Sequence, residues 1–95
     1  SAFMNWVALK AGYERSDKLN ARSWLDVGVK TSSALDADIA IFWRVSKQDW
    51  RGHVGIPVAE REGNIWLLGG NQSNMVNIAP YQKERLLSFV KLKKN

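Results

Sequence analysis

The sequence predicts an α+β fold in which one buried N-terminal helix packs on an antiparallel sheet of about five strands. Residues 2–11 (AFMNWVALKA) are almost continuously apolar and contain no proline, which is typical of a helix. After residue 38 the pattern changes to short apolar segments separated by turn sequences, which is typical of strands joined by hairpins. Helices followed by such a run of strands indicate the α+β class, with the helices on one side of the sheet.

Composition and length limit the chain, residues 1–95, to one small globular domain. Hydrophobic residues make up 45% of it, which argues against disorder, and no apolar segment approaches the roughly 20 residues of a membrane span. The chain has no cysteine and one histidine, so disulfides, zinc fingers and multi-histidine metal sites are excluded within it. The sequence implies no metal and no cofactor.

The net charge of +5 favours an anionic partner such as nucleic acid, acidic lipid or a bacterial wall polymer. Trp50 stands among Arg44, Lys47 and Arg51, a pattern that could hold single-stranded nucleic acid by stacking and charge. No recognisable nucleic-acid-binding motif accompanies these residues, so we expect no nucleic acid partner. The alternative is that Trp50 forms the wall of a groove or belongs to the core.

The first helix is expected to be buried on most sides, because its apolar residues do not follow a single stripe. Gly12 is a plausible residue for its C-terminal end. A second, short helix is predicted up to Asp26, with Asn20 as its N-cap and Gly28 ending it. Residues 29–37 are expected to be irregular.

The alternation of apolar and polar side chains predicts where the strands lie. Residues 39–43 (IAIFW) predict a central strand, and residues 60–64 (EREGN) predict the turn of a hairpin. The strand before that turn alternates so that His53 lies on the face opposite Val54. Residues 65–68 then form the returning strand.

The remaining strands are short. Gly69 and Gly70 are expected to break the returning strand, either as a bulge or to let another group approach closely. A short strand is predicted around residues 76–78, Pro80 predicts a turn, and residues 86–92 predict the last strand.

His53 is the strongest single candidate for chemistry, because histidine alone titrates near neutral pH without perturbation. Its neighbours Gly52 and Gly55 would leave an imidazole accessible. The predicted hairpin returns Asn71 or Gln72 to the start of the His53 strand, where an amide could accept the Nδ1–H and fix the tautomer. A purely structural histidine and a turn-forming Gly-Gly-Asn sequence are the alternatives.

Five short segments occur in a fixed order along the whole chain: SAFMNW (1–6), NARSWL (20–25), ADIAIFWR (37–44), GHVGI (52–56) and LGGNQSN (68–74). Together they resemble the CHAP-like family of bacterial and phage cell-wall hydrolases, which belongs with the NlpC-type papain-like cysteine amidohydrolases and peptidases. The resemblance implies a papain-like α+β fold. It also implies that a cysteine at the start of the central helix is the nucleophile, that His53 is the base, and that Asn71 orients it, with Gln72 the runner-up.

The chain departs from the family at the nucleophile. The family motif usually reads Trp-Cys-(Ala or Ser)-Ala-Phe-Val-Asn-Trp, so Ser1 matches the residue after the cysteine. We therefore expect an N-terminally truncated domain that is inactive in cysteine chemistry as it stands. A shift of one residue would make Ser1 itself the nucleophile, but this shift shortens the spacing to Phe3. A chain that begins with serine could also be an N-terminal-nucleophile hydrolase, a class that normally has a much larger fold.

The resemblance implies a peptidoglycan amidase or endopeptidase domain that acts at the bacterial cell wall. Its partners would be peptidoglycan or muropeptides and an immunity or inhibitor protein. Substrate would contact Trp50, Asn5 and Ser1 along the groove. The alternative is a pseudoenzyme that binds wall fragments or a protein without catalysing a reaction.

Overall fold

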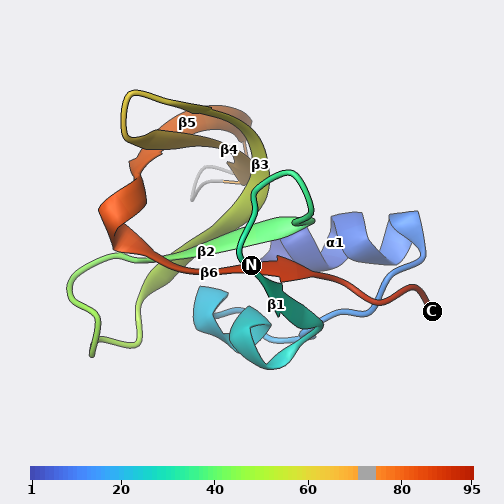
Figure 1. The fold of residues 1–95 in the computed structure, drawn as a ribbon. Coiled ribbons are helices and arrows are strands. Elements are labelled where there is room, and N and C mark those ends of the chain that lie inside the picture. Colours follow the sequence, from blue (N-terminus) through green and yellow to red (C-terminus); the bar gives the residue numbers. More distant parts are fainter. Residues whose placement is uncertain (71–74) are drawn as a thin grey trace.

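An N-terminal helix packs on a six-stranded antiparallel sheet in the computed structural model, which describes residues 1–70 and 75–95 (Figure 1). The predicted α+β class is confirmed, with six strands where about five were expected. The helical elements are α1 (Ala2–Ala11) and the 3₁₀ helices η1 (Ala21–Asp26) and η2 (Lys83–Arg85). The strands are β1 (Val29–Thr31), β2 (Ile39–Trp43), β3 (Gly52–Arg61), β4 (Asn64–Gly70), β5 (Val76–Gln82) and β6 (Leu86–Lys91).

The strand order is β1-β6-β2-β3-β4-β5, so the last strand of the chain lies between the first two. The long strand β3 joins the two halves of the sheet. Its first residues pair with β2, with His53 opposite Phe42, and its later residues pair with β4. The change of partner falls between Gly55 and Ile56, and the register with β4 then shifts between Pro57 and Ala59.

Strand β2 is central, as predicted, because both of its faces are buried. Ile39 and Ile41 pack with α1 and η1, in a cluster that includes the fully buried Trp24. Ala40 and Phe42 face the opposite way and pack in a second cluster with β4 and β6. Side chains alternate across a strand, so only a strand covered on both faces reads as a continuous apolar run.

Helix α1 ends as predicted but is less buried than predicted. Gly12 adopts the left-handed conformation with φ of 82° and caps the helix through its N–H. Only Met4 and Ala8, one helical turn apart, are buried, whereas Trp6 is 58% and Leu9 is 52% exposed. The sheet therefore covers a single face of α1.

Two strand predictions are also corrected. Residues 29–31, expected to be irregular, form β1, because β6 offers them a hydrogen-bonding partner with Val29 opposite Lys91. Pro80, expected in a turn, lies within β5 opposite Trp66. Strand β5 is an edge of the sheet, where a residue without an N–H is tolerated.

The hairpin between β3 and β4 is confirmed, and its turn residues Glu62 and Gly63 have φ values of 53° and 79°. Two successive residues with positive φ match the right-handed twist of the flanking strands. In the part of the chain that the structure describes, no helix is long and apolar enough to cross a membrane.

Candidate functional site

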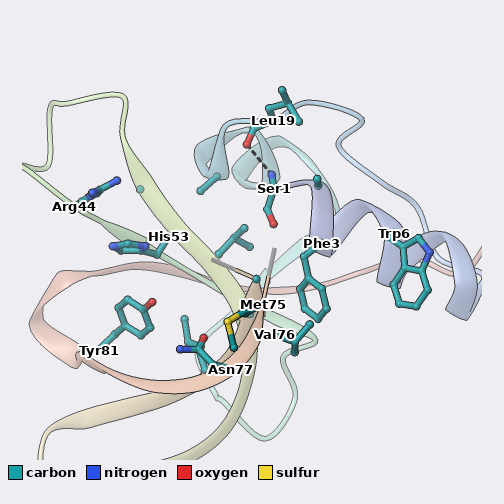
Figure 2. A pocket seen from close by; sticks show the side chains of 17 residues that line it. Ser1, Phe3, Trp6, Leu19, Arg44, His53, Met75, Val76, Asn77 and Tyr81 are labelled. Carbon is teal, nitrogen blue, oxygen red and sulfur yellow. Dashed lines mark hydrogen bonds between the residues drawn. The ribbon is translucent and has the colours of Figure 1, made fainter. Parts of the chain in front are cut away.

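A pocket of about 980 Å³ opens between the N-terminal end of α1, the start of β3 and the strand β5. Figure 2 shows Ser1 and Phe3 on the helix side and Arg44, His53 and Tyr81 on the other side. The start of the first helix and the histidine strand therefore border one cavity.

Ser1 is held at the N-terminal end of α1 by two contacts. Its Oγ accepts a hydrogen bond from the N–H of Met4 at 3.2 Å and caps the helix. Its nitrogen donates to the carbonyl of Leu19 at 2.7 Å, the contact drawn as a dashed line in Figure 2. The positive end of the helix dipole is thus directed at this wall of the pocket.

His53 lies on the face of β3 opposite the buried Val54, as predicted, and is half-buried. Its ring packs against Tyr81, with the ring centroids 4.8 Å apart and the planes at 51°. Tyr81 in turn lies 5.5 Å from the ring of Phe42, measured between centroids. The imidazole therefore has an aromatic ring as a neighbour, and both rings border the pocket.

The glycines beside His53 allow the strands to pack closely. A Cβ on Gly52 would lie 2.6 Å from the carbonyl oxygen of Phe42, and a Cβ on Gly55 would lie 2.8 Å from that of Leu68. Gly70 has a similar role, because a Cβ there would lie 2.6 Å from Cβ of Phe3 on α1. The prediction that Gly69 and Gly70 break the returning strand is wrong, because both lie within β4 and pair with β5. The close approach of another group is confirmed at Gly70.

Burial and the positive charges of Arg44 and Arg85 lower the pKa of His53 from its ordinary value. This shift in pKa favours the neutral imidazole, which is the form that can accept a proton. The same shift has a consequence for stability. The unfolded chain binds a proton at this histidine more readily than the folded chain, so stability falls when the pH is lowered through the ordinary histidine range.

Replacing Arg44 by glutamine is expected to raise the pKa of His53, because it removes one of the two neighbouring cations. The imidazole signals of this single histidine can be followed by NMR during a pH titration. In the unchanged chain the midpoint should lie below the roughly 6.5 of a free imidazole. The matched variant Arg61→Gln, at the far end of β3, should leave the midpoint where it is. An equal shift in both variants would contradict this placement of Arg44.

Two predicted groove residues lie elsewhere. The side chain of Asn5 holds the loop before η1, accepting from the N–H of Asp17 at 3.0 Å and donating to the carbonyl of Lys18 at 3.0 Å. Trp50 is 69% exposed, with the guanidinium of Arg51 5.9 Å from its ring centroid. The described residues that line the pocket include neither Asn5 nor Trp50.

Asn71 and Gln72, the predicted orienting residues, lie outside the described residues. The structure adds Tyr81 and Asn77 to the site, both from β5. Interpreting Pro80 as a turn ended the predicted strand at residue 78, so that it did not include Tyr81. The alternation of Val76, Ile78 and Pro80 with Asn77, Ala79 and Tyr81 is the signal that could have shown a longer strand.

The described residues contain no cluster of three or more histidine, cysteine, aspartate or glutamate side chains that could hold a metal ion. Comparison of this chain with protein-family models, with curated proteins and with solved structures gives no match.

Proposed function

We propose that this chain belongs to a peptidoglycan amidase or endopeptidase domain of the papain-like cysteine class. In this proposal His53 is the general base and acid, and the nucleophile is the residue that precedes Ser1. The observation that carries the proposal is the shared pocket: the start of α1 and His53 border the same cavity from opposite sides. A papain-like site needs this arrangement, with the thiol at a helix N-terminus and the imidazole on a strand.

The pocket suits the chemistry. A thiol just before Ser1 would stand at the positive end of the α1 dipole and near an imidazole, and both lower the pKa of a thiol. The thiolate attacks an amide carbonyl, so that a C–S bond forms and the C–N bond breaks. The imidazolium of His53 protonates the leaving amine. Water then hydrolyses the thioester, with His53 accepting its proton.

The remaining roles rest on the resemblance. Asn71 would orient the imidazole, with Gln72 the second candidate, and neither is placed by the described residues. The net charge of +5 suits a wall polymer that carries carboxylates and phosphates. Ser1 would contact substrate beside the nucleophile, since it lines the pocket.

The second candidate function is a non-catalytic binding module. The observation that favours it is the composition of the chain, whose 95 residues contain no cysteine. A pseudoenzyme would keep the pocket and bind wall fragments or a protein partner without cleaving them.

The deciding experiment reads the codon before Ser1 in the source gene and assays the natural protein that contains this chain on purified sacculi. A cysteine codon there, with release of soluble fragments that stops when this cysteine is replaced by alanine, supports the hydrolase. A start codon or a residue without a nucleophilic side chain, with sacculi bound but not cleaved, supports the binding module and overturns the hydrolase.

A further inference from the structure

Two arginines gather at the His53 end of the pocket. Arg44 follows the last residue of β2 and lines the pocket, and Figure 2 shows its side chain on the same side as His53 and Tyr81. Arg85, at the end of η2, lies next to it, because its Nη1 donates to the carbonyl of Arg44 at 3.2 Å. Both positive charges act on the imidazole of His53.

Arg85 is held in place by an aromatic ring. Its guanidinium lies 4.6 Å from the ring centroid of Trp43, within the range of a cation–π interaction. With its hydrogen bond to the Arg44 carbonyl, this contact fixes the backbone from which the Arg44 side chain projects. Arg85 is therefore a positioning residue, and Arg44 is the cation that borders the cavity.

No acidic side chain of the described residues balances this charge. The ion pairs that they form join Arg15 to Asp17, Arg51 to Asp49 and Lys83 to Glu60. The described residues that line the pocket include no aspartate or glutamate, and residues 71–74 (NQSN) contain none in their sequence. Arg44 is exposed at the mouth of the pocket. A guanidinium there, without a carboxylate partner among the described residues, is accessible to an anion supplied by a ligand.

We propose that Arg44 binds a carboxylate of the substrate peptide at the His53 end of the pocket. A guanidinium matches a carboxylate through two parallel N–H···O bonds. The hydroxyl of Tyr81 and the amide of Asn77, which border the same cavity, are neutral groups available for the rest of the peptide. Phe3 and Val76 give the other walls an apolar character, which suits the alkyl groups of a peptide.

The identity of the ligand rests on the proposed function, because wall peptides carry free carboxylates along their backbone and side chains. The subsite deepens that function by assigning a preference. The bond that is cut should lie close to a carboxylate, and a wall in which this carboxylate is amidated should be a poorer substrate.

The first test measures kcat/KM of the natural protein on muropeptides with free carboxylates and on the same muropeptides with these groups amidated. We expect amidation to lower kcat/KM about 10- to 100-fold, the range for a hydrogen bond to a charged group. Arg44→Gln should lose this preference, so that the ratio of kcat/KM on the free acid to kcat/KM on the amidated substrate falls close to one; the ratio is compared because the same variant also raises the pKa of His53 and so alters both reactions. Arg44→Lys should recover part of the loss, and Arg61→Gln, which removes a charge far from the pocket, should have no effect. Equal kcat/KM on both substrates would overturn the subsite.

The second test needs no catalysis. N-acetyl-L-alanyl-D-glutamic acid and its diamide, in which both carboxylates are carboxamides, are titrated into the 95-residue chain while the NMR signals of its single histidine are recorded. The acid should shift the His53 signals, and Arg44→Gln should weaken its binding about 10-fold. The diamide should bind at least 10-fold more weakly. Equal binding of the two compounds, or binding unchanged by Arg44→Gln, would overturn the subsite.

The two tests separate the subsite from the function on which it rests. Failure of the natural protein to cleave sacculi overturns the hydrolase, and the carboxylate subsite is then decided by the titration alone. Cleavage of sacculi without any preference for the free acid overturns the subsite and leaves the hydrolase in place.

Discussion

Replacing His53 by alanine is expected to abolish hydrolysis of purified sacculi by the natural protein that contains this chain. Loss of a general base and acid lowers a rate typically by 10² to 10⁴. This loss should leave no detectable release of fragments above background. His53 is the single histidine of the chain, and no other imidazole borders the pocket. The measurement is the release of soluble muropeptides over time.

The fold is expected to survive this substitution, because His53 is half-buried and its main ring contact is with Tyr81. His53→Gln is a second variant that fills more of the space and still lacks a proton acceptor of suitable pKa. Val58→Ala, on the same strand and 49% exposed, is the matched control and should retain activity. Full activity in both His53 variants would disprove the catalytic role of this histidine.

The largest expected effect on stability comes from Gly28. Its φ is 72°, and a Cβ there would collide with the backbone carbonyl oxygen of Lys91 and lie 2.9 Å from Cγ1 of Val90. Gly28→Ala therefore combines a left-handed conformation, costing about 1–2 kcal/mol, with overpacking that costs typically about 1–3 kcal/mol. For a domain of this size the sum is a large part of a free energy of unfolding of roughly 5–14 kcal/mol.

Gly63→Ala is a closely matched control for this prediction. Gly63 has a similar φ of 79°, but no heavy atom would lie within 4 Å of an added Cβ. The free energy of unfolding of Gly63→Ala should therefore fall only by the cost of the left-handed conformation, about 1–2 kcal/mol. Urea unfolding followed by tryptophan fluorescence gives both values. An equal decrease in the free energy of unfolding of the two variants would contradict this prediction, because it would show that Lys91 and Val90 move aside without cost.

The parts of the fold that could be predicted are those encoded by neighbouring residues. Gly12 marks the end of α1, Asn20 caps η1 through the N–H of Ser23, and the glycine of the β3–β4 turn defines a hairpin. Strand β1 could not be predicted, because its partner residues 89–91 lie some 60 positions further along the chain. The turn predicted at Pro80 is wrong because a proline is tolerated within a strand at the edge of a sheet. That β5 is an edge strand is a property of the whole sheet and not of the neighbouring residues.

The candidate site likewise has one part that the sequence encodes locally and another that depends on how distant elements pack. The sequence alone identifies His53 as the candidate base, because no other residue has its chemistry. The surroundings of His53 could not be predicted, since the packing of the sheet places Tyr81 of β5 against its ring and the charge of Arg85 of η2 near it. The exposed faces of Trp6 and Leu9 were misjudged for a related reason, because apolar composition does not show how many sides of a helix its neighbours cover.

The position of β6 between β1 and β2 determines when the protein can fold during synthesis. Strand β2 has both faces in the core, yet one of its two neighbours is made only when translation has reached residues 86–91. Until these residues leave the ribosome, β2 presents an open edge and an apolar surface to other nascent chains. The sheet is therefore expected to close around β2 only after residues 86–91 have left the ribosome.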